Sequence, residues 1–496
     1  MKNIFLLVIM LAVALSSCNN FEELEKDPNR PGEVPPSLVF TNVLYGIYNS
    51  PWSDIQRWNQ FWCSNYAYYS DQEYDWTNTS FNYTQMKNVA QMIAESKRVG
   101  MADNNPYAAI GKFLNAYYFV EMSMKLGDIP LTDALKSLEN TKPKYDSQKA
   151  VFKQALIWLE EANSDLQVLN NNLDKSLTGD FMLGNDLKKW QKVVNTYKLR
   201  VLITLSKKEA DADLNIKKLF SDVLTNPTKY PLMTSLDDNL KFSYNSVTDK
   251  YPLNPDNYGF TATRNNMSAT YLNTLASLKD PRTFIVADPA PAKIKAGLTI
   301  ADFEAYVGAS SGESLDDMST KMLKGEYSPI SKNKYYSSYF GEPAIQIGYP
   351  EMCFNIAEAI NRGWVAGNAE DYYTKGIKAS WTFHGVPSVD AKWDAYYAQP
   401  TVKLNSTTPE ALKQILTQKY LAFFQNSGWE AYNNYRRTGV PTFLTGAGTA
   451  NSGRIAKRWQ YPSSERTTNA DNYKAALKNQ FGAETDDINS EMWIIK

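Results

Sequence analysis

The sequence predicts a mainly α protein: a scaffold of tetratricopeptide-like helical hairpins with an irregular loop-rich lobe carrying short strands. Two observations predict this class. Long amphipathic segments follow one another in pairs, with Ala, Gly and aromatic residues at the expected contact positions. Between residues 211 and 348 the pattern changes, and the chain becomes polar, aromatic and rich in turn residues, with few clear helices.

Three helices are expected in the first half of the chain. The first starts at Pro106 and stops at Gly127, because glycine commonly terminates a helix. The second covers "SQKAVFKQALIWLEEANSDL", and the third is opened by Asp186 as an N-cap. The buried face expected of the first helix contains Ile110, Phe113, Leu114, Tyr117, Val120 and Met124.

The second half repeats this pattern. One helix begins at Pro350 and ends at Gly363, and a second covers "NAEDYYTKGIKASWTF". A further helix is predicted to run without a break from Pro409 through "PEALKQILTQKYLAFFQNSGWEAYNNY". Beyond it, four residues are expected to pin the returning C-terminal segment: Arg458, Tyr461, Pro462 and Glu465.

Two segments of the middle region combine tyrosines with turn residues. They are "YNSVTDKYPLNPDNYGFTATRNN" and "KGEYSPISKNKYYSSYFGEP". Loops of this length inside a compact domain usually carry function. We therefore expect the loop-rich lobe to contribute to the functional site.

The N-terminus has the pattern of a secretory signal. Lys2 precedes the apolar run "IFLLVIMLAVAL", which is too short for a stable membrane span. The run ends in "LSSC", which resembles the lipobox of bacterial lipoproteins and implies lipidation of Cys18. The predicted organisation is a signal peptide over 1–17 and a lipidated Cys with an extended, proline-rich tether over 18–36. A single domain follows over 37–496, with the helical scaffold at about 37–210 and 349–440, the loop-rich region at 211–348 and a C-terminal segment at 441–496.

Composition excludes some classes of function. A net charge of −1 gives no electrostatic footprint for nucleic acid. Cys63 and Cys353 lie among apolar residues and are interpreted as buried free thiols. Aromatic residues make up 13% of the chain, a surplus that suits surfaces that stack flat ligands as well as a core.

Catalytic and metal-binding patterns are weak. His384 is the one histidine, so zinc motifs with two histidines are excluded, and we expect no metal, cofactor or catalytic set. The "GASSG" match around Ser310 lacks the strand and helix of a nucleophile elbow and is interpreted as a loop. Glycosidases need two carboxylates at a defined separation. The densest acidic stretch, "YYSDQEYDW", offers Asp71, Glu73 and Asp75.

The aromatic segment from Trp52 to Trp76, which contains this stretch, is a better candidate for ligand binding. Trp58, Phe61 and Trp62 have helical spacing and are expected in the core. In an extended segment Tyr74 and Trp76 would face the same way, about 6.6 Å apart, with the acidic side chains opposite. Aromatic faces beside carboxylates suit a sugar ring, so the predicted ligand-binding residues are Tyr66, Tyr69, Tyr74, Asp75 and Trp76. Packing in the core is the alternative role for each of these aromatic residues.

Several segments in order resemble the SusD/RagB family of Bacteroidetes outer-membrane lipoproteins, in particular its SusD-like branch. They are "DPNRP", "FLNAYYFVEMSMKLGDIPL", "WQKVVNTYKLRVLITLS", "KDPRTF", "EMCFNIAEAINRGW", "AEDYYTKGIKASW", "QKYLAFFQNSGWEAYNNYRRTGVP", "RIAKRWQYPSSERTTNADNYKAAL" and "MWIIK". The resemblance implies a surface-exposed, non-enzymatic lipoprotein anchored in the outer membrane. Such a protein covers a SusC-like TonB-dependent transporter and delivers captured ligand to it. The ligand is an oligosaccharide or, in the RagB-like branch, a peptide.

Three alternatives to oligosaccharide capture stay open. A peptide-capturing homologue would differ only in its binding site. A surface glycosidase would use carboxylates such as Asp71 and Asp75. A pure assembly scaffold would bind the transporter and no soluble ligand.

Overall fold

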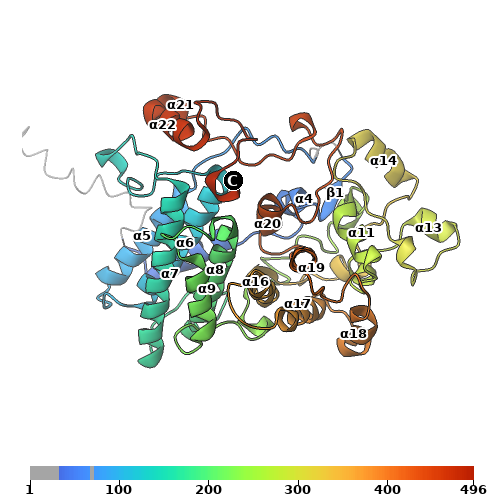
Figure 1. The fold of residues 1–496 in the computed structure, drawn as a ribbon, viewed down its shortest axis with the longest axis horizontal. Helices are drawn as coiled ribbons and strands as arrows, with labels where there is room; N and C mark the ends of the chain where they lie inside the picture. The colour runs from blue at the N-terminus through green and yellow to red at the C-terminus, as the bar shows by residue number, and fades with distance from the viewer. Residues whose placement is uncertain (1–32, 67–71) are drawn as a thin grey trace, which may run out of the picture.

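The computed structural model describes residues 33–66 and 72–496 and confirms the mainly helical class (Figure 1). The longer helices are α3 (Pro36–Ile47), α5 (Tyr83–Arg98), α6 (Pro106–Leu126), α7 (Gln148–Asn171), α8 (Leu187–Thr204), α9 (Ile216–Thr225), α16 (Tyr349–Asn361), α17 (Ala369–Phe383), α19 (Thr408–Ala422) and α22 (Ala470–Phe481). The shorter ones are α4 (Asp54–Trp58), α10 (Tyr258–Thr261), α11 (Ala269–Ser277), α12 (Thr283–Val286), α13 (Pro291–Lys295), α14 (Leu315–Leu323), α15 (Lys332–Tyr335), α18 (Val389–Tyr397), α20 (Glu430–Thr438) and α21 (Glu465–Thr468). The predicted signal segment and Cys18 lie outside the described residues.

Consecutive helices pack against one another, as the hairpin interpretation predicts. Helix α5 lies against α6, α6 against α7 and α7 against α8. In the second half α16 packs on α17, and both contact α19. Helix α8 also contacts α16, which joins the two halves of the scaffold. Among the described residues, no helix is both long enough and apolar enough to cross a membrane.

The ends of the predicted helices have the expected caps. The side chain of Asp186 accepts hydrogen bonds from the amides of Lys188 and Lys189, at 2.9 and 3.2 Å, and so satisfies donors at the start of α8. Helix α6 ends at Gly127, whose φ of 91° is accessible to glycine at little cost.

The single helix predicted from Pro409 to Tyr435 is wrong, because the chain breaks between α19 and α20. In the break Gln425, Ser427 and Gly428 all have positive φ. The backbone there pairs with a distant strand instead: the amide of Ser427 donates to the carbonyl of Ile345 at 2.7 Å. Tertiary hydrogen bonds therefore override a helical sequence pattern at this point.

Short strands occur in the loop-rich lobe, as predicted. Strand β1 (Trp62–Ser64) pairs antiparallel with β3 (Asn265–Met267), and β2 (Leu240–Phe242) pairs antiparallel with β4 (Ala344–Ile347). The region contains more helix than expected, and side-chain caps stabilise two of its short helices, α11 and α14. Ser314, for example, accepts a hydrogen bond from the amide of Asp317 at the start of α14.

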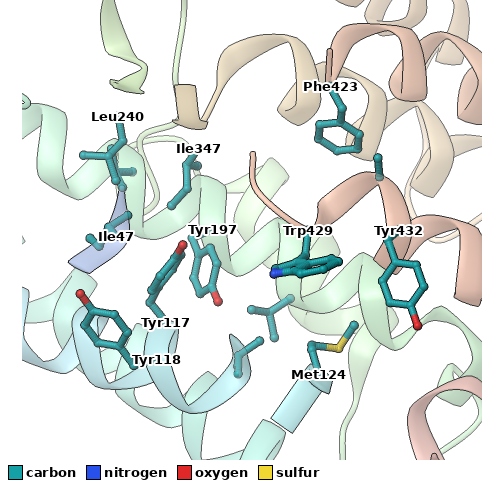
Figure 2. Close-up of a cluster of buried hydrophobic side chains, with 14 of the residues drawn as sticks. Ile47, Tyr117, Tyr118, Met124, Tyr197, Leu240, Ile347, Phe423, Trp429 and Tyr432 are labelled. Carbon is teal, nitrogen blue, oxygen red and sulfur yellow. The ribbon is translucent and has the colours of Figure 1, made fainter. Parts of the chain in front are cut away.

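One hydrophobic core connects the scaffold to the strands of the loop-rich lobe. Figure 2 shows part of it, in which Tyr117 lies next to Tyr197 and Trp429 lies next to Tyr432. The ring centroids of Tyr117 and Tyr197 are 5.5 Å apart. Residues of α3, β2 and β4 contribute Ile47, Leu240 and Ile347 to the same core. The loops that leave these strands therefore start from fixed positions on the scaffold.

The C-terminal segment is pinned as predicted. Arg458 forms a buried ion pair with Asp486. The hydroxyl of Tyr461 donates to the carbonyl of Asp128 at 2.6 Å. The carboxylate of Glu465 accepts a hydrogen bond from the hydroxyl of Tyr145 at 2.7 Å. The ion pair holds two parts of the C-terminal segment together, and the contacts of Tyr461 and Glu465 join the segment to the end of α6 and the loop after it.

Two carboxyl groups near the end of α6 are expected to make stability fall as pH rises. Burial raises the pKa of Asp128 to about 7. Burial, together with the charge of Glu430, raises the pKa of Glu121 to about 7 as well. An unfolded chain releases these protons near pH 4. The folded protein holds more protons than the unfolded one between about pH 4 and pH 7, so the free energy of unfolding decreases across that window.

The Asp128→Asn variant tests this prediction. Its amide stays neutral and keeps an oxygen to accept from the amide of Gln148, which donates to Asp128 at 2.8 Å. We expect the Tm of the unmodified protein to be lower at pH 7.5 than at pH 5, and the difference to be smaller in the variant. Thermal unfolding followed by circular dichroism measures both values. The same difference in the two proteins would contradict the assignment to Asp128.

Candidate functional site

Tyr74 and Trp76 lie inside the protein, so the prediction that they offer stacking faces to a ligand is wrong about their exposure. The prediction that this segment is extended is correct, because its side chains alternate. Glu73 and Asp75 are exposed, while Gln72, Tyr74 and Trp76 are buried. The aromatic side of the segment, however, faces the core. Tyr74 is 0% exposed and Trp76 is 5% exposed.

Other aromatic side chains occupy the space where a sugar was expected. The ring of Trp76 stacks on Trp459 with centroids 3.9 Å apart and an interplanar angle of 7°. The edge of Trp429 approaches it at 5.5 Å, and Trp58 does so at 5.8 Å. Trp429 and Trp459 are distant in the sequence, so no local pattern around Trp76 indicates that its ring is already covered.

The remaining predictions in this stretch fall into three groups. Phe61 and Trp62 are buried and Trp58 is partly buried, which confirms their place in the core. Tyr66 is 44% exposed, and Asp75 is also exposed. Tyr69 and Asp71 lie outside the described residues.

The structure brings partly buried tyrosines and exposed lysines of the two turn-rich segments near Tyr66. The amide of Asn65 donates to the carbonyl of Arg264 at 2.9 Å, which continues the β1–β3 pairing beyond both strands. Tyr66 is thereby placed beside Arg264, whose guanidinium lies 4.2 Å from the centre of the tyrosine ring. We call the following residues the aromatic–cation surface: Tyr66, Lys250, Tyr258, Arg264, Lys332 and Tyr339.

A second tyrosine–cation pair continues this surface at α10. The ammonium of Lys332 lies 4.4 Å from the ring centre of Tyr258. The ring of Tyr258 meets Tyr336 edge to face at 5.1 Å. Thr261, on α10, donates to the hydroxyl of Tyr336 at 3.1 Å. These contacts connect the last turn of α10 to the segment that carries Lys332.

A third pair lies at the start of α10. The ammonium of Lys250 is 4.5 Å from the ring centre of Tyr339. The hydroxyl of Tyr339 donates to Asp256 at 2.7 Å, and Lys250 forms an ion pair with the same carboxylate at 2.8 Å. The ring, the ammonium and the carboxylate therefore hold one another in place at the surface.

This arrangement can bind a sugar. Partly exposed tyrosine rings offer flat faces for the apolar face of a sugar ring, while ammonium, guanidinium and carboxylate groups offer partners for its hydroxyls. The sequence predicts that Tyr66 binds ligand and that both segments are functional, but it does not single out the other residues of this surface. The signal that could have found them is the repeated placement of Lys or Arg near Tyr within turn-rich loops.

The side chains considered for catalysis, His384 and Ser310, make contacts within the fold. His384 is fully buried, with its Nδ1 3.3 Å from the carboxylate of Glu342 and its ring against Phe424. The hydroxyl of Ser310 accepts from the amide of Gly312 at 3.3 Å within its own loop. No group of side chains able to hold a metal ion occurs in the described part of the chain.

Both cysteines of the described domain are buried free thiols, as predicted. Burial raises the pKa of Cys63 to about 11 and that of Cys353 to about 12. At neutral pH both side chains are therefore uncharged and behave as small apolar groups.

The comparisons with known proteins agree with this fold. A family model for SusD-like proteins, described as starch-binding and associating with the outer membrane, matches residues 28–462. The chain therefore belongs to the SusD-like family, whose members are described as associating with the outer membrane. None of the curated proteins that were compared matches the chain.

Solved structures show the same architecture. Two SusD homologues from Bacteroides fragilis are each 32% identical to this chain, with TM-scores of 0.83 and 0.81. They cover 93% and 94% of this chain and 100% of their own. A chitin-binding SusD homologue from Flavobacterium johnsoniae is 19% identical, with a TM-score of 0.72, and covers 93% of this chain and 98% of its own. This last similarity shows the fold alone.

Proposed function

We propose that this protein captures oligosaccharides on its aromatic–cation surface and passes them to a SusC-like TonB-dependent transporter in the outer membrane. The observation that carries the proposal is the set of three tyrosine–cation pairs around α10, from Tyr66 to Tyr339. Because each ring is already held beside its cation, it loses little conformational freedom when a sugar stacks on it.

The family supports the general part of this proposal. Its model is described as starch-binding, and a relative with the same fold is chitin-binding. The finer parts are also proposed: lipidation at Cys18, an outward-facing position on the cell, a transporter partner and a non-enzymatic role. Lipid attached to Cys18 and a tether of about 18 residues would keep the domain beside its transporter. High local concentration then makes a modest affinity sufficient.

Affinity electrophoresis tests capture directly. A soluble form that begins at residue 19 is run through gels that contain plant, host or microbial polysaccharides. We expect at least one polysaccharide to retard it. A Tyr66→Ala/Tyr258→Ala double variant should bind that polysaccharide about ten-fold or more weakly, because two stacking faces are lost.

The matched control is a tyrosine–lysine pair elsewhere on the surface. On α17 the ammonium of Lys375 lies 5.2 Å from the ring centre of Tyr372, so the Tyr372→Ala/Lys375→Gln variant removes a similar pair. It should be retarded like the unmodified protein. If the Tyr66 and Tyr258 variant is also fully retarded, capture stands and the proposed site is wrong.

The other outcomes separate the remaining alternatives. No retardation by any polysaccharide would favour peptide capture or a scaffold role, which a peptide panel and a transporter pull-down then distinguish. Release of shortened sugars from the retarding polysaccharide would identify a glycosidase and contradict the non-enzymatic part of the proposal.

A further inference from the structure

A groove separate from the aromatic–cation surface lies against α18, which is at the lower right in Figure 1. Its volume is about 520 Å³, within the range of small-molecule sites, about 300–1,000 Å³. It shares no lining residue with the aromatic–cation surface. The lining residues are Lys279, Pro281, Phe284, Phe303, Ala391, Lys392, Ala395, Tyr396 and Gln399. We call it the Phe284–Phe303 groove.

One wall of the groove is aromatic and rigid. Phe284 and Phe303 are partly buried, and their ring centroids are 4.4 Å apart. Phe284 also meets the buried ring of Tyr306 at 5.3 Å, which fixes its orientation. Helix α18 lines the groove with Ala391, Ala395 and Tyr396 as well as Lys392. The two alanines are too small to fill the groove, which leaves space for a ring against the phenylalanines.

The rim of the groove is cationic. Lys279, which follows α11, and Lys392, on α18, are exposed, and no carboxylate lines the groove. Acidic side chains next to the lining residues in the chain either form ion pairs with other residues or do not line the groove. Asp280 is buried in an ion pair with Arg282, and Asp390 pairs with Lys378. Glu304 and Asp394 are exposed and are not lining residues.

A polar group lies between the aromatic wall and the rim. The amide nitrogen of Gln399 donates to the carbonyls of Leu278 and Tyr396, at 3.0 and 3.1 Å. These two hydrogen bonds fix the side chain at the edge of the groove. Its amide oxygen is then positioned to accept a hydrogen bond from a hydroxyl group.

We propose that the Phe284–Phe303 groove binds an acidic sugar. The apolar face of the sugar ring would lie on the two phenylalanines, its carboxylate between the ammonium groups of Lys279 and Lys392, and a hydroxyl against Gln399. Charge-assisted hydrogen bonds from two lysines favour a carboxylate over a neutral substituent. The combination of an apolar ring face, one anion and hydroxyls distinguishes a uronic acid from a fatty acid and from a neutral sugar.

Isothermal titration with defined trimers tests this site. The probes are trigalacturonate, trimannuronate and, as the neutral counterpart, maltotriose. We expect at least one acidic trimer to bind saturably, and a Lys279→Gln/Lys392→Gln variant to bind it about ten-fold or more weakly, because two charge-assisted hydrogen bonds are lost. A Phe303→Ala variant should also weaken binding.

The control variant removes two lysine charges from another part of the surface. Lys293 and Lys295 on α13 are exposed, so the Lys293→Gln/Lys295→Gln variant changes the net charge equally without altering the groove. It should bind the acidic trimer like the unmodified protein. Equal weakening in both double variants would show a general charge effect and overturn the site. Failure of both acidic trimers to bind saturably, or maltotriose binding as tightly in the groove, would overturn it too.

This groove and the proposed capture surface are tested independently. The Tyr66→Ala/Tyr258→Ala variant should keep its affinity for the acidic trimer, and the Lys279→Gln/Lys392→Gln variant should keep its retardation by a neutral polysaccharide. Loss of acidic-trimer affinity in the tyrosine variant alone would place that ligand on the aromatic–cation surface and contradict the groove.

Discussion

Replacing Trp76 by alanine is expected to lower the free energy of unfolding by about 3–5 kcal/mol, the usual cost of truncating a buried tryptophan. The indole is stacked on Trp459 and surrounded by Trp58, Trp429 and Tyr432, so its loss leaves a cavity among rings that cannot close around it. Urea denaturation followed by circular dichroism measures the change without depending on tryptophan fluorescence.

Tyr66→Ala is the matched comparison, because it truncates an exposed aromatic residue at the other end of the same stretch. Its effect on unfolding should be much smaller. If the Trp76 variant were as stable as the unmodified protein, the burial of this ring would be wrong, and the prediction from the sequence that Trp76 stacks on a ligand would gain support.

Asp280→Asn is expected to destabilise the fold by a similar amount, about 3–5 kcal/mol, because it leaves a buried charge without its partner. Asp280 and Arg282 are both 0% exposed, and Arg282 donates to the carboxylate through Nε and Nη2 at 3.0 and 2.8 Å. Tyr396 and Trp381 also donate to it. An asparagine cannot accept all of these hydrogen bonds or neutralise the guanidinium.

The exposed pair between Lys378 and Asp390 provides the control for this variant. Their nitrogen and oxygen are 3.0 Å apart, but Asp390 is 92% exposed, so water already solvates the carboxylate. Surface ion pairs contribute little to stability. Asp390→Asn should therefore leave the urea midpoint nearly unchanged. Equal losses of stability in the Asp280→Asn and Asp390→Asn variants would contradict the structural role assigned to the buried ion pair.

Local patterns were sufficient to predict the scaffold helices. Apolar spacing from Ile110 to Met124 indicates the buried face of α6, and an acidic N-cap at Asp186 marks the start of α8. These signals act within one or two helical turns, so they can be read without knowing the tertiary structure. The ion pair and hydrogen bonds of the C-terminal segment were predictable as anchors, but their partners were not.

The errors arise where distant segments determine the local structure. The chain between α19 and α20 has a helical pattern, yet Ser427 and Asn426 hydrogen-bond to Ile345 of β4. The sequence around Trp76 predicts a ligand-stacking residue because nothing near it in the chain indicates its partner, Trp459, which is almost four hundred residues away. The sequence does not predict the aromatic–cation surface for the same reason, because Tyr66 meets Arg264 only through the pairing of β1 with β3.

Hydrogen–deuterium exchange with bound polysaccharide tests the central claim most directly. The protein is compared with and without the glycan that retards it most strongly in gels. Capture on the aromatic–cation surface predicts slower exchange in residues 256–264 and 332–340, with no change around the buried Trp76. Slower exchange confined to other elements, or no glycan that binds at all, would contradict capture by this surface.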